Sequence, residues 1–256
     1  ILSVQRVGGI STVWREYVRR LGEEFGAGEV TLLVPVGRRA EVAELNEGGF
    51  AMQAVAPRGR VTKYAPLMLR GQPHDVLHTS YYQGAPRFRG RRVVTVHDLT
   101  HRKHGYPAVR MVHDAAMERA VDAADVVVTP SEATAGDLRR LVDYSGHLEV
   151  VPHAVDIDTF YPEEDESQTP YCLWVGRRDW YRDYAAAVSA VKELRREVPG
   201  LELRVVGDRG KGAGPVVYEG FVSRQRLREL YSGALALFYL SYSEGFGLPI
   251  LEAQAC

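Results

Sequence analysis

The 256-residue sequence has no long apolar run, few cysteines and almost no net charge. A membrane-spanning helix needs about 20 consecutive apolar residues, and no run here approaches that length. Two cysteines, Cys172 and Cys256, make neither a disulfide framework nor a zinc site, which favours a reducing compartment such as the cytoplasm. A formal net charge of −1 argues against a dedicated nucleic-acid-binding protein. With no low-complexity tract, the composition is that of a globular protein.

Positive charge is nevertheless concentrated in residues 58–119, which include 12 Lys or Arg but only 4 Asp or Glu. A basic face attracts anions, such as a nucleotide, a phospholipid head group or an anionic acceptor. A solvated surface rich in arginine explains the same composition without a ligand. Both interpretations stay open, and the first includes peripheral contact with the inner face of a membrane.

Short β-branched runs alternate with longer segments whose apolar residues recur three and four positions apart. This pattern is typical of parallel α/β layering. Expected strands are 30–34, 75–78, 93–97, 126–129, 149–151, 172–175, 203–206, 216–218 and 235–239. Expected helices are 12–24, 108–123, 132–142, 184–197, 225–231 and 248–256.

An acidic segment that ends in proline interrupts this pattern. Residues 163–170 contain four acidic side chains and no large apolar one, so they cannot form a core element. We therefore expect a first Rossmann-like lobe over 1–162, a linker over 163–170 and a second lobe over 171–256. The second lobe is short for a doubly wound domain and the chain begins without an initiator Met. We expect a sequence that is cut short at both ends.

The stretch from Glu244 to Glu252 carries the strongest chemical signal and reads EGFGLPILE. It follows an expected strand and opens an expected helix, with Pro249 near the helix start, where its missing N–H does no harm. Free N–H groups at a helix N-terminus suit a phosphate or a hydroxyl, and Gly245 and Gly247 allow a ligand to approach closely. An ordinary strand-to-helix turn explains any one of these residues, but explains the whole string much less well.

Two Glu residues separated by seven positions, with Gly-Phe-Gly-Leu-Pro between them, resemble the donor-site motif of the retaining group 1 glycosyltransferases. That family has the GT-B fold, an α/β architecture of two Rossmann-like lobes. The resemblance implies that Glu244 and the following turn, Phe246, Gly247 and Leu248, contact the transferred sugar, and that Glu252 holds the ribose hydroxyls of the nucleotide. The fold implied is GT-B with its second lobe truncated at the C-terminus.

A second segment resembles the family's Gly-Arg turn and downstream basic residue, which grip the donor diphosphate. Here Arg177 follows Gly176, and Arg182 is the downstream cation. Two guanidinium groups at a strand end can neutralise a diphosphate leaving group. The family usually has Lys followed by Gly or Asn where this chain has Arg182-Asp183, so Arg182 is the weaker assignment. A surface ion-pair cluster with Asp179 and Asp183 is the alternative.

Three more segments agree with the resemblance. Gly8 and Gly9 precede a helix, as in the family's N-terminal glycine loop, and His97 ends a strand, as does the family's histidine that contacts the transferred sugar. Residues 151–162 resemble the segment that leaves the first lobe. Taken alone, a glycine pair is weak evidence, and a strand-end histidine is equally compatible with a structural role.

Two other patterns point to different chemistry. Asp156 and Asp158 mimic the acidic pair that holds Mg²⁺ or Mn²⁺ in the other main glycosyltransferase fold. Because Arg177 and Arg182 already supply positive charge, we interpret the pair as structural. Residues 207–212, GDRGKG, hint at a phosphate-binding P-loop, but the spacing is wrong and Gly follows the Lys, so we expect a flexible loop.

The reaction that the resemblance implies is hexosyl transfer from a nucleoside diphosphate sugar to an acceptor hydroxyl, with retention and without metal or cofactor. The catalytic set is His97, Arg177, Arg182 and Glu244. The acceptor is a saccharide, a lipid-linked saccharide or a small molecule. A sugar-nucleotide epimerase of the same architecture and a non-catalytic sugar-nucleotide-binding fragment are the alternatives. The sequence specifies neither base nor sugar, although the Trp180-Tyr181 turn suggests mannose carried on GDP.

Overall fold

The computed structural model describes residues 9–35, 47–55, 64, 66–69, 74–79, 82–104, 107–163 and 169–256. The chain divides into two compact units, Ile1–Pro152 and His153–Cys256. This division falls ahead of the expected linker at 163–170. The physical reason is Phe160, which is buried in the second unit against Tyr171 and Tyr231 and so ties the segment before the linker to that unit.

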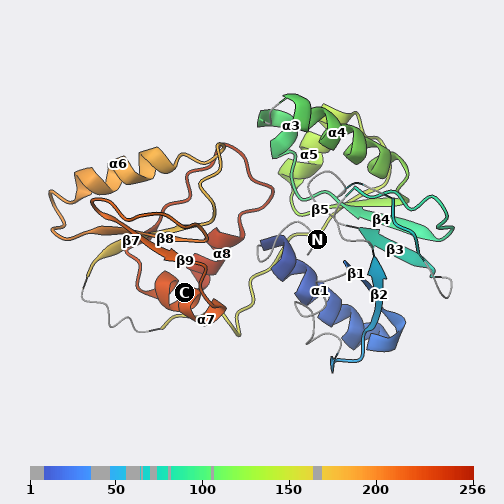
Figure 1. Ribbon diagram of the computed structural model, residues 1–256, viewed down its shortest axis with the longest axis horizontal. Helices are drawn as coiled ribbons and strands as arrows, with labels where there is room; N and C mark the ends of the chain where they lie inside the picture. The colour runs from blue at the N-terminus through green and yellow to red at the C-terminus, as the bar shows by residue number, and fades with distance from the viewer. Residues whose placement is uncertain are drawn as a thin grey trace. The chain divides into compact units, whose positions relative to one another are not determined.

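The first unit contains two parallel sheets (Figure 1). A pair is formed by β1 (Thr31–Pro35) and β2 (Ala51–Val55). The other sheet has the order β3-β4-β5-β6, with bounds Val76–Thr79, Arg91–Thr95, Val126–Thr129 and Leu148–Val150. The helices are α1 (Gly9–Phe25), α3 (Thr100–His104), α4 (Pro107–Asp122) and α5 (Glu132–Val142), with a short 3-10 helix, η1, at Ala27–Glu29.

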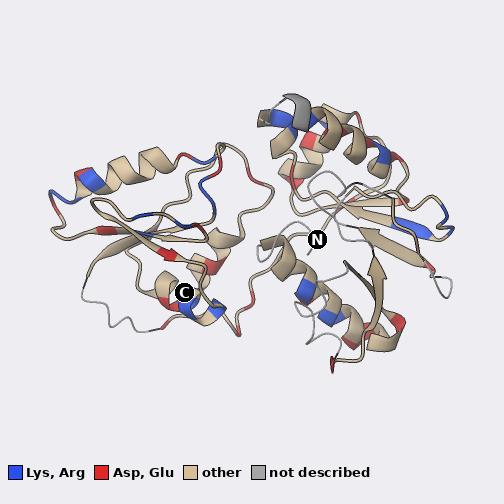
Figure 2. Cartoon of the chain, in the orientation of Figure 1, with Lys and Arg blue, Asp and Glu red and all other residues tan. Residues whose placement is uncertain are grey.

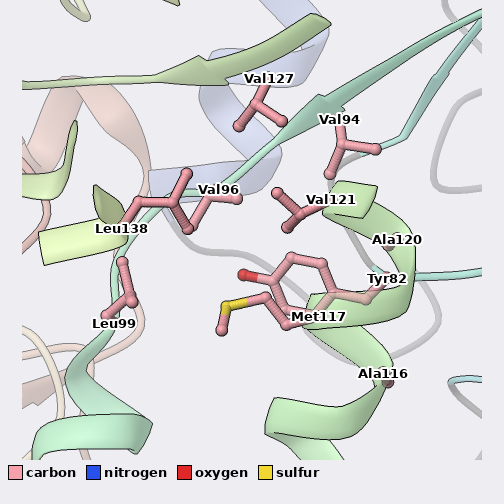
Figure 3. Close-up of a cluster of buried hydrophobic side chains, with 10 residues drawn as sticks. All are labelled: Tyr82, Val94, Val96, Leu99, Ala116, Met117, Ala120, Val121, Val127 and Leu138. Atoms are coloured by element: carbon pink, nitrogen blue, oxygen red, sulfur yellow. The ribbon is translucent and has the colours of Figure 1, made fainter. Parts of the chain in front are cut away.

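One core of this unit lies between the larger sheet and its helices (Figure 3). Val94 and Val127 project from β4 and β5 toward α4 and α5. They meet Met117 and Val121 of α4 and Leu138 of α5, all of them fully or almost fully buried. This packing fixes the direction of β4 and of the residues that follow it.

The second unit has one parallel sheet of order β10-β7-β8-β9. The strands are β7 (Tyr171–Val175), β8 (Glu202–Val206), β9 (Val216–Gly220) and β10 (Ala236–Leu237). The helices are α6 (Tyr184–Leu194), α7 (Arg224–Ser232) and α8 (Leu248–Ala255). Figure 1 shows α6 on one face of this sheet and α7 and α8 on the opposite face.

The sequence of β7, YCLWV, explains why helices cover both faces. Successive side chains of a strand point to opposite sides of the sheet. Cys172 and Trp174 pack in the cluster that includes Val191 of α6. Tyr171 and Leu173 pack in the cluster that includes α7. A strand that is buried on both faces belongs in the centre of a parallel sheet.

Each expected strand and helix overlaps an observed one, and the bounds predicted for β5 and α5 match the structure. Three elements of the described residues were not predicted: β2, the short helix α3 and the 3-10 helix η1. The strand expected over 93–97 ends at Thr95, so His97 lies in the loop that follows β4.

Candidate active site

The carboxyl ends of β7, β8, β9 and β10 share one edge of the second unit, because all four strands are parallel. In open α/β sheets, ligands bind beyond this edge. The chain turns sharply there at Gly176, which follows β7, and at Gly207, which follows β8, with φ angles of 117° and 85°. Gly176 N–H donates to Val206 O at 2.9 Å, and Gly207 N–H donates to Gly220 O at 2.7 Å. These bonds hold the turns side by side.

The loop between β7 and α6 is joined to the loop between β10 and α8 through the backbone. Arg182 and Ser241 form an isolated antiparallel bridge. On either side of the bridge, Asp183 N–H donates to Leu240 O at 2.9 Å, and Tyr242 N–H donates to Tyr181 O at 3.0 Å. The two loops that carry the predicted donor-binding residues therefore form one framework.

This framework places Arg182 against Glu244. Nε and Nη2 of Arg182 each lie 2.8 Å from Oε1 of Glu244, which also accepts a hydrogen bond from Ser241 Oγ at 2.9 Å. Only 13% of the Arg182 side chain and 23% of the Glu244 side chain are exposed. Burial works against the charge of Arg182, but the Glu244 carboxylate holds the pKa of Arg182 above its ordinary value. The Arg182 guanidinium therefore stays charged.

Gly176 makes room for this pair. A Cβ at Gly176 would collide with Nη1 of Arg182, and its φ angle lies in the region that disfavours other residues. The glycine of the Gly-Arg turn is therefore required both by the backbone and by the guanidinium beside it.

Arg177 is in a different environment from Arg182. It lies two residues beyond β7 and pairs with Asp179 at 3.2 Å, with 73% of its side chain exposed. The alternative of a surface ion-pair cluster therefore fits Arg177 and Asp179, but not Arg182. Asp183 caps α6 by accepting a hydrogen bond from Ala186 N–H at 2.9 Å. Capping accounts for an Asp where the family has Gly or Asn.

The motif from Glu244 to Glu252 has the predicted local structure. Gly247 is the N-cap of α8 with φ 100°, and the helix begins at Leu248 with a proline in its first turn. Phe246, just before the cap, packs its ring 5.2 Å from that of His153. Glu252 lies one turn inside α8, where burial raises the pKa of its carboxyl. Oε2 of Glu252 accepts a hydrogen bond from Tyr231 at 2.8 Å.

The remaining predicted residues belong to the first unit. Gly9 is the first residue of α1, whereas Gly8 lies outside the described residues. His97 is buried two residues beyond the end of β4. The preceding residue, Val96, donates its N–H to Val128 O at 2.9 Å and so continues the ladder toward β5.

Sequence analysis did not identify Arg178. Its Nε donates to Oδ2 of Asp208 and its Nη1 to the hydroxyl of Tyr218, both at 2.8 Å. Its guanidinium lies 5.2 Å from the ring centre of Tyr184 and 5.1 Å from that of Tyr218. Arg178 thus anchors the start of the glycine-rich 207–212 loop. No sequence signal marks these partners, which come from three different segments.

Asp156 has structural partners. Its Oδ2 accepts hydrogen bonds from Thr159 Oγ1 at 2.6 Å and from Nη2 of Arg224 at 3.0 Å. Its Oδ1 accepts one from the backbone N–H of Asp158 at 3.2 Å. These contacts support the structural interpretation of the acidic pair. Among the residues that the structure describes, no group of three or more His, Cys, Asp or Glu could hold a metal ion.

The basic region at 58–119 is partly neutralised by acids from inside and outside it. Arg91 pairs with Asp125 at 2.7 Å and Lys103 pairs with Asp137, both from outside the region. Arg102 pairs with Asp114 and Glu118 of α4, inside it. In Figure 2, basic and acidic segments alternate over α3, α4 and α5. Within the described ranges, no helix is both long enough and apolar enough to cross a membrane.

Family models match nearly the whole chain. Glycosyltransferase Family 4 matches residues 7–159, and Glycosyl transferases group 1 matches residues 157–256. The chain belongs to the group 1 glycosyltransferases. The Arg177, Arg182, Glu244 and Glu252 positions all lie in the group 1 match.

Known proteins agree with the family assignment. The chain is 27% identical to a D-inositol 3-phosphate glycosyltransferase of Xylanimonas cellulosilytica, over 77% of this chain and 59% of the relative. It is 26% identical to the O-antigen chain mannosyltransferase B of Escherichia coli, over 65% of this chain and 51% of the relative. Sucrose-phosphate synthase of Thermosynechococcus elongatus shares the fold, with a TM-score of 0.68 and 20% identity over 99% of this chain and 75% of that structure. This group 1 glycosyltransferase chain spans between half and three fifths of the length of the two sequence relatives.

Proposed function

We propose that this chain carries the donor site of a retaining glycosyltransferase, which moves a hexosyl group from a nucleoside diphosphate sugar to an acceptor hydroxyl. The observation that carries the proposal is the partly buried Arg182–Glu244 pair at the carboxyl edge of the second sheet. One turn into the adjoining helix, Glu252 presents a second carboxylate. A cation, a helix N-terminus and two carboxylates at one sheet edge match the needs of a diphosphate, a sugar and a ribose.

The roles proposed for the positive groups follow from the charge that develops on the leaving group during the reaction. As the bond between the sugar and the diphosphate breaks, negative charge grows on the leaving group. The α8 N-terminus and the guanidinium groups of Arg177 and Arg182 are positive groups that favour this charge. Because Arg182 is held by Glu244 and by the backbone, it requires little reorganisation during the reaction. Arg177, paired only with Asp179 at the surface, can exchange that partner for a phosphate.

Donor and acceptor are proposed from the relatives. The names of the two sequence relatives specify a mannosyltransferase and a D-inositol 3-phosphate glycosyltransferase. We propose mannose on GDP as the first donor to test, with a saccharide, lipid-linked or small-molecule hydroxyl as acceptor. For His97, Gly8 and Gly9 we propose the roles that the family resemblance implies, and we propose that no metal ion or cofactor takes part.

The decisive experiment is a donor panel on the full-length enzyme. Acceptor-dependent release of free nucleoside diphosphate is expected with one donor, and product NMR should show the anomeric configuration of that donor. A new sugar nucleotide formed without acceptor would instead identify an epimerase. A thermal shift with donor, but no turnover with any acceptor, would identify a binding protein.

We propose in addition a cytoplasmic location with peripheral contact to the inner face of a membrane. Met111 and Val112 are exposed on α4, next to the exposed Arg110. An apolar pair beside a cation suits the interface of an anionic bilayer. Sedimentation with phosphatidylserine vesicles should fall when Met111 and Val112 are both changed to Asp. Phe25→Asp, at an exposed apolar position on α1, is the matched control and should leave sedimentation unchanged.

A further inference from the structure

Tyr231 of α7 makes a hydrogen bond that the proposed reaction leaves unexplained. Its hydroxyl lies 2.8 Å from Oε2 of Glu252 in α8, across 21 positions of sequence. The tyrosine is buried, and its ring packs against Phe160 with a centroid distance of 6.0 Å. Burial, and after it the charge of Glu252, raise the pKa of Tyr231 above its ordinary value. The hydroxyl therefore stays protonated and acts as the donor.

We propose that Tyr231 is a positioning residue that fixes the Glu252 carboxylate for the ribose of the donor nucleotide. An ionised carboxylate has about four acceptor directions on two oxygens. Tyr231 occupies one direction on Oε2, which leaves Oε1 and the rest of Oε2 for the two ribose hydroxyls. A rigid phenol in the core thus selects one rotamer of a carboxylate that would otherwise rotate. This inference rests on the ribose-binding role proposed for Glu252.

The same hydrogen bond favours the ionised form of Glu252. Burial raises the pKa of the Glu252 carboxyl, while the Tyr231 hydrogen bond and then the positive charge of Arg224 act to lower it. A further titratable group beside it is Cys256, the C-cap residue of α8, whose thiol pKa is raised by burial and partly by Glu252. Because a protonated carboxyl accepts fewer hydrogen bonds, loss of the tyrosine hydroxyl weakens ribose binding first at the acid end of the pH range.

Tyr171 provides a matched control. It is buried in the same cluster as Tyr231, and its hydroxyl donates to the backbone oxygen of Leu230 at 3.0 Å. Tyr231→Phe and Tyr171→Phe therefore each remove one buried hydroxyl and keep the ring. Only Tyr231→Phe removes a hydrogen bond to Glu252.

The test is calorimetry on the full-length protein with three kinds of probe. UDP and GDP are compared with their 2′-deoxy forms, and pyrophosphate reports phosphate binding without ribose. Tyr231→Phe should weaken binding of UDP or GDP, whichever the wild type binds more tightly, about 3- to 10-fold near pH 6. This is the scale of one lost hydrogen bond. The defect should shrink toward pH 8, discrimination against the 2′-deoxy form should fall, and pyrophosphate affinity should not change. Tyr171→Phe should alter none of these.

Glu252→Gln distinguishes a failure of the ribose-binding role of Glu252 from a failure of the positioning role of Tyr231. If Glu252→Gln keeps full discrimination between ribose and 2′-deoxyribose, the ribose role of Glu252 is wrong, and the donor site of the proposed function with it. If Glu252→Gln loses discrimination but Tyr231→Phe keeps it, only the positioning role of Tyr231 is wrong. Equal losses for nucleotide and pyrophosphate in Tyr231→Phe would show a merely structural effect and overturn the inference. Should Tyr231→Phe not fold, Glu252→Asp takes its place. Its side chain is one methylene shorter, and its affinities for nucleotide, 2′-deoxynucleotide and pyrophosphate are judged by the same criteria.

Discussion

Arg182 and Glu244 lie 62 positions apart in sequence, and their side chains meet through a shared oxygen, Oε1 of Glu244, at 2.8 Å from both Nε and Nη2 of the arginine. The pair joins the loop after β7 to the loop before α8. The two arginines that the sequence predicts at the donor diphosphate therefore differ. Arg182 is held in place by this pair, whereas Arg177 is exposed. The predictions below test that difference.

Arg177→Ala should reduce turnover about 10²- to 10³-fold, the scale seen when one group that stabilises the developing charge is removed. Folding should be little changed, because 73% of the side chain is exposed. Arg177→Lys should recover only part of the rate, since it lacks the planar fork of the guanidinium. The measurement is the initial rate at saturating donor, with circular dichroism as the folding control. A normally folded Arg177→Ala protein with near wild-type turnover would show that the diphosphate is held elsewhere.

Arg182→Ala should instead destabilise the fold, by about 1–3 kcal/mol of unfolding free energy, because it leaves the partly buried Glu244 carboxylate without its cation. Arg177→Ala, which breaks a surface pair, should cost less than about 0.5 kcal/mol. Urea unfolding of both variants makes the comparison. A double-mutant cycle with Glu244→Ala should give a coupling of similar size to the loss in Arg182→Ala, and a coupling near zero would contradict the assigned contact.

Glu252→Gln should weaken nucleoside diphosphate binding by about 1–3 kcal/mol, as for a lost hydrogen bond to a charged group. In the wild type, ribose binding should require the ionised carboxylate. Because burial raises the pKa of Glu252, affinity should fall as pH drops through that raised value, above the range of an ordinary Glu. Calorimetry across the acid range checks both expectations. Unchanged affinity for the free nucleoside diphosphate in Glu252→Gln would remove this residue from the donor site.

Activity of the full-length enzyme should survive excess EDTA, since the proposed counter-charges are guanidinium groups. Asp156→Asn should lower stability by about 1 kcal/mol without abolishing turnover. The Thr159 hydrogen bond, partly opposed by burial and aided by Arg224, holds the pKa of Asp156 below its ordinary value. A lowered folded-state pKa contributes stability above about pH 4, which is lost as pH falls through the folded value. The variant and the wild type should therefore converge in acid. Loss of activity in EDTA that Mn²⁺ restores would revive the metal-binding interpretation of Asp156.

The local pattern of the sequence was sufficient to predict most elements, for physical reasons visible in the structure. Strand β7 is continuously apolar because helices cover both its faces, and α5 is bounded by Ser131, whose side chain accepts from Thr134 N–H. Strand β2, AMQAV, lacks such a run, and only one of its residues is buried. Its hydrogen bonds to β1, rather than its own composition, make it a strand.

The site was predictable only where a motif is continuous in sequence. Glu244, Gly247 and Glu252 could be placed around a helix start from their spacing alone. The different environments of Arg177 and Arg182 could not be predicted in this way, because the partner of Arg182 is remote along the chain. The contact between Tyr231 and Glu252 joins two helices, and no periodic pattern in the sequence indicates it.

The antiparallel bridge between Arg182 and Ser241 has a consequence for protein engineering. Insertions or deletions between Gly176 and Asp183 would shift Arg182 out of register with the opposite loop, whose partner atoms are backbone groups that no compensating side chain can supply. Attempts to change donor preference by exchanging loops with a relative should therefore transplant 177–183 and 239–247 together. Exchange of one loop alone would break the backbone hydrogen bonds between the two loops wherever the new loop differs in length.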